Sequence, residues 1–307
     1  MDVVSDAISA VRQGRPSSNR LRVRGRWCVR LAPYEGAGFH VVLGGACWLL
    51  PDGGGEPVAL GAGDVVLLPH GTGHVLADGP VEARDLARAV PFEQVSGPFV
   101  GPPGTGARRS EVELLCGKYR LDRSRVHPLM AELPKVVHLR NRVGAHPELR
   151  SAVDLLAHEL TDSRPGAALA LPSLLDLLLV YMVRAWMTEA ETGAWPAVLT
   201  DPVTTAALRA LHAAPAAAWT NARLATEAGV SRATLARRFT ALVGRPPMAY
   251  LTWWRLTLAA RRLRDTDVPL AAVARESGYG SPYALSHAFS REFGVTPGRY
   301  RERVRVG

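Results

Sequence analysis

The chain has 307 residues, enough for two domains, and its 47% hydrophobic and 21% charged residues are those of an ordinary soluble globular protein. The formal net charge of +9 is confined to the last third: residues 1–200 carry 21 basic and 21 acidic side chains, and residues 201–307 carry 16 and 7. Such a local excess is typical of a surface that binds a polyanion. The three scattered cysteines (Cys28, Cys47 and Cys116) exclude a disulfide framework and fit a reducing, cytoplasmic setting.

The first 20 residues predict a short helix and a linker, and they lack the apolar segment of a signal peptide. The longest apolar stretch, residues 171–187, is interrupted by Asp176 and Arg184. A buried helix is therefore expected there rather than a membrane span, and we expect no membrane partner.

From about residue 21 to 120, short apolar runs alternate with Gly, Pro and Asp. This spacing of strand and turn signals predicts a β-sandwich or barrel. Residues 101–110, GPPGTGARRS, predict an exposed loop. The segment VELLCGKYRL (112–121) then predicts a strand that returns to the sheet.

Residues 63–78 follow the pattern G-x5-P-x-G-x2-H-x3-D. Its fixed positions are Gly63, Pro69, Gly71, His74 and Asp78. This pattern resembles the second sequence motif of the cupins, with Asp78 where Asn is usual. The resemblance implies a cupin-like β-barrel, which we assign as a sensor domain over residues 1–125.

The first cupin motif has the form H-x-H-x3–4-E-x6-G. Its positions are held here by His40, Val42, Cys47 and Gly54. Valine thus replaces the second histidine and cysteine replaces the glutamate. A thiolate in place of a hard oxygen ligand disfavours iron or manganese and favours zinc, and four such ligands would form a closed tetrahedral site. The predicted zinc ligands are His40, Cys47, His74 and Cys116.

Three alternatives stay open for this domain. The barrel holds an organic effector and no metal, or His70 takes the place of Cys116 as a ligand. In the third alternative an oxidant attacks Cys47 or Cys116, and the loss of a metal ligand loosens the domain. Cys28, beside Trp27, is expected to be a buried small residue.

Apolar side chains recur at helical spacing in residues 146–160 and 171–190. The second of these helices is apolar around much of its surface, so it must bury more than one face. We therefore assign residues 126–195 as a helical dimerisation region, in which a helical hairpin packs on a second copy of itself. A linker is expected over residues 196–204.

The last hundred residues contain an internal repeat with a period of 49 to 50 residues. The residues Ala225, Glu227, Gly229, Ser231, Leu235, Phe239, Gly244 and Pro247 recur as Ala274, Glu276, Gly278, Ser281, Leu285, Phe289, Gly294 and Pro297. Each copy predicts a helix, a tight glycine turn, a serine N-cap and a second helix. This is a tandem helix-turn-helix, in which the second helix of each unit enters the major groove of DNA.

The polar face of each second helix is expected to contact DNA. In the first copy this face consists of Ser231, Arg232, Thr234, Arg237 and Arg238. In the second copy it consists of Ser281, Tyr283, Ser286, His287 and Arg291. The aromatic residues Phe239, Trp253, Trp254 and Phe289 are expected in the core. Phosphate contacts or plain surface positions are expected for Arg261, Arg262, Arg299 and Arg301.

Residues 205–303 resemble the AraC/XylS family of transcription regulators, whose closing signature stands here as ARESGYGSPYALSHAFSREFGVTPGRYR (274–301). With the cupin-like domain, the resemblance covers nearly the whole chain. It implies an α+β protein: an N-terminal cupin-like β-barrel followed by helices, and a C-terminal all-α tandem helix-turn-helix domain over residues 205–307. The implied function is that of a bacterial regulator that binds directly repeated half-sites in double-stranded DNA. A homodimer, a small-molecule effector and RNA polymerase are the further partners we expect.

The competing hypothesis is a metal-dependent cupin enzyme, an oxygenase or isomerase, with an appended DNA-binding domain. The missing second histidine and the missing glutamate argue against it, because an open catalytic site needs three well-placed ligands and a labile position. We therefore expect no enzymatic activity. The expected function is sequence-specific transcription regulation, with a sensor domain that responds to a small molecule, a metal or an oxidant.

Overall fold

The computed structural model describes residues 3–80, 86, 89–95, 99–100, 111–121, 128–160, 165–190, 197–198 and 200–306. The chain divides into two compact units. The sheet unit comprises Arg12–Arg123 and Leu133–Glu189, and the helical unit comprises Met1–Val11, Ser124–Glu132 and Ala190–Gly307. The first helix of the chain thus belongs with the C-terminal helices rather than with the strands that follow it. The predicted loop at 101–110 lies outside the described residues.

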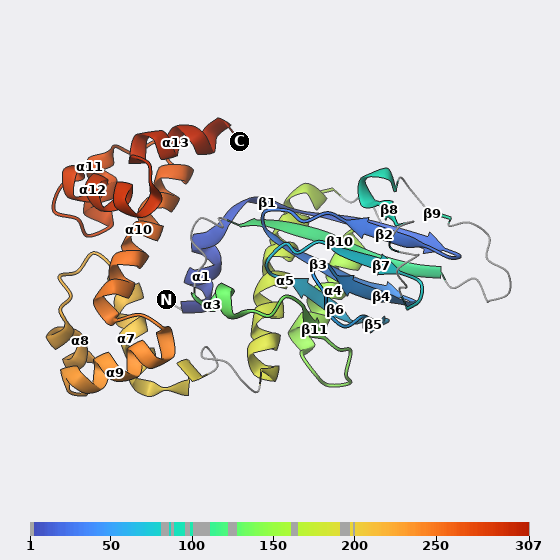
Figure 1. Ribbon diagram of the computed structural model, residues 1–307, viewed down its shortest axis with the longest axis horizontal. Helices are drawn as coiled ribbons and strands as arrows, with labels where there is room; N and C mark the ends of the chain where they lie inside the picture. The colour runs from blue at the N-terminus through green and yellow to red at the C-terminus, as the bar shows by residue number, and fades with distance from the viewer. Residues whose placement is uncertain are drawn as a thin grey trace. The chain divides into compact units, whose positions relative to one another are not determined.

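The described strands of the sheet unit form two sheets (Figure 1). The six-stranded sheet has the order β11-β6-β3-β10-β1-β9, with β1 (Arg12–Arg24), β3 (Ala37–Gly44), β6 (Val65–Leu68), β9 (Phe99–Val100), β10 (Glu111–Leu121) and β11 (Val137–Leu139). The five-stranded sheet has the order β5-β4-β7-β2-β8, with β2 (Cys28–Leu31), β4 (Ala46–Pro51), β5 (Val58–Gly61), β7 (His74–Ala77) and β8 (Val90–Pro91). A 3-10 turn, η1 (Phe92–Gln94), follows β8.

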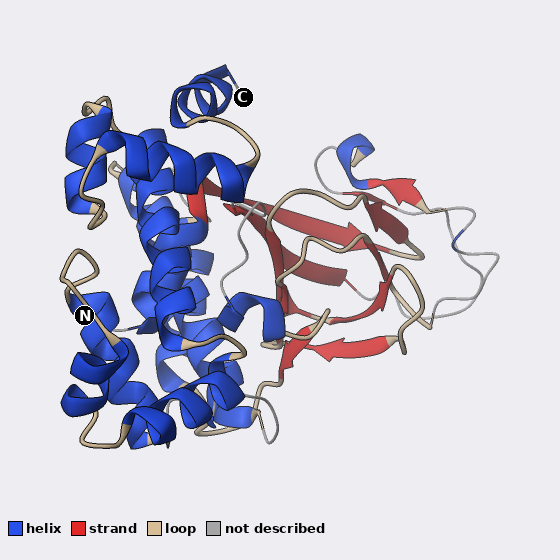
Figure 2. Ribbon diagram, turned by 60° about the vertical axis from the view of Figure 1, so that its left-hand side comes forward, coloured by secondary structure: helices blue, strands red, loops and turns tan. Residues whose placement is uncertain are grey.

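The two sheets face each other across one apolar core, around which Figure 2 shows the strands in red. Val42 and Leu114 enter this core from the six-stranded sheet, and Leu49 and Leu76 enter it from the five-stranded sheet. Because side chains alternate between the faces of a strand, each sheet can present such a row to its partner. All four residues of β6 are buried, since helices also cover the outer side of its sheet.

The glycines of the sequence motif at 63–78 shape the turns at both ends of β6. Gly63 and Gly71 have φ angles of +84° and +58°, which L side chains rarely adopt. The backbone of Gly71 also lies so close to the loop before β3 that a Cβ would overlap the carbonyl of Tyr34. The motif therefore carries a turn geometry as well as its histidine.

Two helices complete the sheet unit: α4 (Pro147–Glu159) and α5 (Ala167–Glu189) pack against each other. α5 also packs on β1 and β11. The hydroxyl of Tyr119 on β10 donates a hydrogen bond to the carbonyl of Leu175 (2.6 Å), and Arg12 pairs with Asp176. The predicted helical hairpin is thus present as part of the sheet unit rather than as a separate region.

The helical unit contains α1 (Val3–Val11), α3 (Pro128–Glu132), α7 (Pro202–Ala213), α8 (Asn221–Glu227), α9 (Arg232–Val243), α10 (Pro247–Asp265), α11 (Leu270–Glu276), α12 (Pro282–Phe293) and α13 (Pro297–Val306). α10 packs on α1, α9, α11 and α13, so it forms the centre of the unit. The predicted fold class, α+β with N-terminal sheets and a C-terminal helical region, is confirmed. α7 begins inside the stretch that was expected to be a linker, at Pro202.

Candidate nucleic-acid interface and sensor cavity

The helical unit contains two copies of a helix-turn-helix. The first consists of α8 and α9, and the second of α11 and α12. Ser231 and Ser281 cap the second helices, because each Oγ accepts a hydrogen bond from the backbone N–H three residues later at 3.1 Å. Both helices end at a glycine in the left-handed conformation, Gly244 and Gly294. The predicted tandem arrangement is confirmed, and we call α9 and α12 the reading helices.

One face of each reading helix is fixed in the core. Leu235 and Phe239 of α9 are fully buried, and so are Leu285 and Phe289 of α12. Residues four apart lie on the same side of a helix, so the opposite side is left for other contacts. The aromatic residues that the sequence placed in the core are all buried: Phe239, Trp253, Trp254 and Phe289.

On α9, the predicted DNA-contacting residues differ in their solvent exposure and in their hydrogen bonds. Arg232 and Arg237 are exposed. Thr234 is half-buried and its hydroxyl lies 2.9 Å from that of Ser231, so both hydroxyls are engaged at the start of the helix. Arg237 is therefore the best-placed long side chain in the middle of α9.

Arg238 is held by a carboxylate of its own unit. Its Nη1 atom lies 3.3 Å from Oδ1 of Asp201. Asp201 is the N-cap of α7, where its other oxygen accepts a hydrogen bond from the backbone N–H of Thr204 (2.8 Å). A contact of Arg238 with DNA would compete with this pair, whose two residues are 37 positions apart along the chain.

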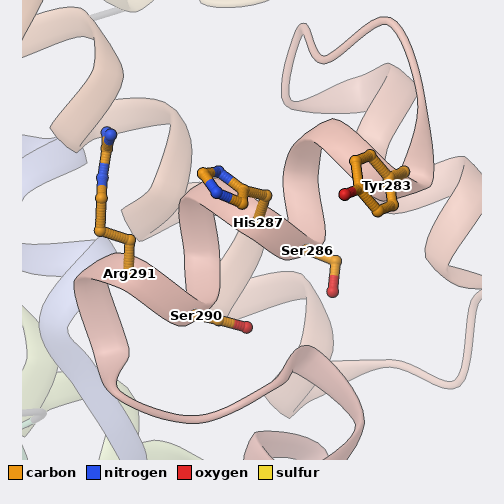
Figure 3. Close-up of a pocket in the computed structure, with 5 residues that line it drawn as sticks. All are labelled: Tyr283, Ser286, His287, Ser290 and Arg291. Atoms are coloured by element: carbon orange, nitrogen blue, oxygen red, sulfur yellow. The ribbon is translucent and has the colours of Figure 1, made fainter.

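On α12, five side chains line a shallow hollow of about 480 Å³ (Figure 3). They are Tyr283, Ser286, His287, Ser290 and Arg291. Tyr283 is 81% exposed, which is unusual for an aromatic side chain without a partner to bind. Ser290 was missed by the sequence analysis, although its position four residues after Ser286 places it on the same face. Ser281 serves instead as the cap of the helix.

Some of the other arginines have partners within the helical unit. Arg262 Nη2 lies 2.6 Å from Glu276 Oε2, and Arg261 Nε lies 3.5 Å from Asp265 Oδ2. Arg301 donates to the carbonyl of Val268 at 2.7 Å. The Arg262 pair joins α10 to α11, the Arg261 pair lies within α10, and Arg301 of α13 contacts the loop before α11.

A buried polar chain joins α1 to the core of the first helix-turn-helix. Asp6 Oδ2 lies 3.0 Å from Nδ1 of His212, and Nε2 of His212 lies 2.8 Å from the hydroxyl of Tyr250. His212 also stacks on Trp254, with ring centroids 4.3 Å apart. The sequence analysis did not find this set, because its members are up to 248 positions apart along the chain and follow no motif.

In the sheet unit, three of the four predicted zinc ligands line one cavity of about 180 Å³. His40 of β3 and Cys116 of β10 are opposite each other in the antiparallel register, and His74 begins β7 in the other sheet. The cavity is also lined by Ser17, Ser18 and Asn19 of β1, by Leu31, Ala32, Pro33 and Tyr34, and by Phe92, Glu93 and Lys118. The motif histidines thus meet at the edge of the core between the sheets.

The hydrogen bonds of the two histidines determine where their protons lie. His74 Nδ1 is 3.0 Å from the carbonyl oxygen of Thr72, which can only accept, so this nitrogen carries a proton. The Nε2 atoms of His74 and His40 are 2.7 Å apart, so with both rings neutral the His40 nitrogen donates and the His74 nitrogen accepts. Nδ1 of His40 is then a bare acceptor, and it has no hydrogen-bond partner among the described residues.

Burial keeps both rings neutral. It lowers the pKa of His40 well below its ordinary value of 6.5, with a further contribution from His74, and it lowers the pKa of His74 as well. A pair of neutral imidazoles offers hydrogen bonds to a ligand but no charge.

The fourth predicted ligand, Cys47 of β4, lies in the apolar core with Cys116. Burial raises the pKa of the Cys47 thiol to about 12 and raises that of Cys116 further. Cys47 is not among the residues that line the cavity with His40, His74 and Cys116. In the part of the chain that the structure describes, no three His, Cys, Asp or Glu side chains are grouped to hold a metal ion. The side chains therefore do not match the closed four-ligand set, and zinc stays a prediction of the sequence.

His70, the alternative ligand, and Cys28, expected to be a buried small residue, lie outside the cavity. Nε2 of His70 is 2.7 Å from the carbonyl oxygen of Leu133, so the side chain fastens the segment before β11 rather than entering the cavity. Cys28 is half-buried, and Leu31 is the residue of its strand that lines the cavity.

The neutral histidine pair predicts a loss of stability at acid pH. Because the folded pKa values are lowered, the unfolded chain binds more protons below about pH 6.5, and the free energy of unfolding falls there by up to about 1.4 kcal/mol per pH unit for each histidine. Urea unfolding of the full chain at pH 7.5 and 5.5 measures this. The His40→Gln/His74→Gln double variant should show a weaker pH dependence, whereas exposed His158→Gln should match the wild type. Equal pH dependence in all three proteins would contradict the assignment.

Comparison with known proteins covers both units. The family described as cupin matches residues 2–188, and the family described as helix-turn-helix domain matches residues 224–303. A putative AraC-like transcription regulator of Streptomyces antibioticus is 36% identical over 304 residues, which are 98% of this chain and 99% of that protein. The RCS-specific HTH-type transcriptional activator RclR of Escherichia coli is 32% identical over 253 residues, 78% of this chain and 89% of that protein.

Among solved structures, the DNA-binding domain of AdpA, a global transcriptional factor in complex with a target DNA, is 34% identical in sequence. The match covers 35% of this chain and 96% of that one, with a TM-score of 0.33. The family matches and the full-length relatives agree with the two units and the two reading helices described above. The chain therefore belongs to the AraC family of DNA-binding transcription regulators, with a cupin domain followed by a helix-turn-helix domain.

Proposed function

We propose that this regulator responds to a small neutral organic molecule bound between its two sheets, and that the occupied cavity changes how α9 and α12 bind DNA. The observation that carries this proposal is a cavity of about 180 Å³ lined by His40, His74 and Tyr34. Nδ1 of His40 and the hydroxyl of Tyr34 are both buried and have no hydrogen-bond partner among the described residues. A buried polar atom without a partner is costly, so a ligand that pairs with it gains affinity.

The cavity wall defines the chemistry of the ligand. Nδ1 of His40 accepts, so the ligand must present a hydroxyl or an N–H group. The hydroxyl of Tyr34 stays protonated, because burial raises its pKa, and it can donate to an oxygen of the ligand. Leu31 and Phe92 supply apolar surface beside these groups. A compact molecule with one hydroxylated end and one apolar end fits this set.

The same observations weigh against an oxidant as the signal. An oxidant reacts with a thiolate, and the raised pKa values of Cys47 and Cys116 leave little thiolate at neutral pH. The full-length relatives are named as regulators, which favours regulation over a cupin enzyme.

We also propose that the protein is a homodimer held by α4 and α5. α5 is long and apolar, with a mean hydropathy of 1.7 over its most apolar window, yet only 28% of that window is buried. Leu155 of α4 and Leu169 and Leu177 of α5 are 52%, 77% and 39% exposed. Leucines exposed on two adjacent helices are covered when the same hairpin of a second copy packs against them.

The cavity proposal predicts that phenol stabilises the protein more than benzene does, because only phenol has a donor for Nδ1 of His40. We expect millimolar phenol to raise the melting temperature of the full chain by roughly 2 °C, the shift of a weak ligand well above its Kd. The His40→Phe variant should lose the difference between the two compounds, and His70→Phe, outside the cavity, should keep it. Equal stabilisation by both compounds, or about one zinc per chain by elemental mass spectrometry, would refute the proposal.

If α9 and α12 contact DNA, Arg237→Ala and Arg291→Ala should each weaken binding to a duplex selected by this protein by roughly 10- to 100-fold. This is the loss expected for one contact to a base edge. Arg238→Ala should cost less, because that side chain is already paired with Asp201. Fluorescence anisotropy at several salt concentrations separates base from phosphate contacts. Arg120→Ala, exposed on the sheet unit, is the control, and a loss there as large as at Arg291 would contradict the assignment.

The dimer proposal predicts that the Leu169→Glu/Leu177→Glu variant sediments as a monomer at concentrations where the wild type is a dimer, because buried glutamates would repel across the interface. Sedimentation velocity is the measurement. Val143→Glu changes an apolar residue outside α4 and α5 that is more exposed than either leucine, and it should leave the dimer intact. A wild type that is monomeric at about ten micromolar, far above the Kd of a specific dimer, would disprove the proposal.

A further inference from the structure

Three segments of the helical unit meet at one side chain, Arg255, which lies near the middle of α10. Its Nε donates a hydrogen bond to the carbonyl of Pro215 (2.7 Å), and its Nη2 donates to the carbonyl of Ala217 (2.8 Å). Pro215 and Ala217 lie in the loop between α7 and α8, which leads into the first helix-turn-helix. A planar guanidinium that makes two such bonds is fixed in orientation.

The same guanidinium lies against the turn of the second helix-turn-helix. A Cβ built on Gly278 would be 3.0 Å from Nε of Arg255 and 2.7 Å from Cα of Ala216. Gly278 has a φ angle of +76°. Glycine is therefore needed there both for the backbone conformation and for the close approach of the two chain segments. The loop that precedes the first helix-turn-helix and the turn of the second touch directly, with Arg255 beside the contact.

This contact adds a second connection between the two copies. The first connection is α10 itself, which buries Tyr250 and Trp254 toward α7 and α9, and Leu256 and Leu263 in the core of the second copy. Two bodies packed on different parts of one helix can still rock about its axis. A further contact away from that axis, between residues 215–217 and Gly278, opposes this rotation.

We propose that Arg255 is a positioning residue for DNA recognition, which braces the two helix-turn-helix copies so that α9 and α12 are presented at one fixed separation and rotation. The spacing between the two half-sites then becomes part of the specificity. This inference rests on the proposal that both reading helices contact DNA, and it adds the element that couples them.

The physical consequence is a penalty for altered spacing. Two extra base pairs rotate the second half-site by about 70° around the duplex, since B-DNA has 10–10.5 base pairs per turn. A braced pair of reading helices cannot follow this rotation and loses one set of contacts. A loosened pair follows it in part, but it binds the correct site less tightly because ordering the two copies then costs entropy on binding.

The test uses the full chain and a duplex selected by the wild type from a random pool, with and without two base pairs inserted between the half-sites. For the wild type we expect the insertion to raise Kd by roughly 30-fold or more, the loss of about one set of base contacts. For Arg255→Ala we expect Kd for the selected duplex to rise several-fold. The insertion should then raise the Kd of this variant by only roughly 3-fold more. Arg255→Lys, which can donate to one carbonyl but not as a fork, should lie between the two.

A second variant tests the same contact from the other side. Gly278→Ala keeps the Arg255 side chain but would place a Cβ against Ala216 and the guanidinium. This variant should therefore also reduce the increase in Kd that the insertion causes. Arg262→Ala is the matched control, because Arg262 lies on the same helix and pairs with Glu276. This variant should show the same increase in Kd on insertion as the wild type. Thermal melting of each variant verifies that it is folded.

The outcomes separate the two proposals. A wild type that binds both duplexes equally well disproves the use of two reading helices. The brace is overturned if the wild type binds the selected duplex more tightly than the lengthened one and the folded Arg255→Ala and Gly278→Ala variants show the same ratio of Kd values. An equal loss of affinity for both duplexes, with their ratio unchanged, means that Arg255 acts only on stability and overturns it as well. If Arg255→Ala does not fold, the Arg255→Lys and Gly278→Ala variants decide.

Discussion

The burial of α10 is the constraint on which DNA binding by this protein depends. A helix-turn-helix of two short helices has little apolar surface of its own to bury, so it is stable only against a third element. α10 is that element for both copies: Tyr250 and Trp254 are buried toward the first, and Leu256 and Leu263 toward the second. The two reading helices consequently share one support, and the geometry that each presents to DNA is tied to that of the other.

The sheet unit follows the same logic with a different chemical result. Its two sheets exclude water from a common core, and the cupin motif brings two histidines to the edge of that core. Burial there makes the imidazoles neutral and the thiols protonated. The protonation state of these side chains thus depends on their burial as well as on their residue type. His40 and His74 hydrogen-bond to each other there, and Cys47 packs in the apolar core.

Much of the site could be predicted because its signals are local in the chain. The serine caps, the glycine turns and the leucine–phenylalanine pairs of the repeat depend on neighbours within four positions, and all of them occur as expected. Residues whose roles depend on distant partners could not be assigned in this way. Arg238 matches the pattern of a DNA contact, but Asp201, a residue 37 positions earlier, holds it. Ser231 and Ser281 match it too, but their hydroxyls cap helices.

By itself the sequence determined the two classes of domain, the tandem repeat and the faces of its helices, because periodicity and turn chemistry are properties of short segments. Only the tertiary structure decided which unit each segment joins. α1 precedes β1 directly, yet its Asp6 reaches His212 in the helical unit. It also decided that Cys47 lies in the core while His40 and His74 meet. Burial and long-range pairing arise only when the whole chain has packed, and a linear pattern carries no measure of either.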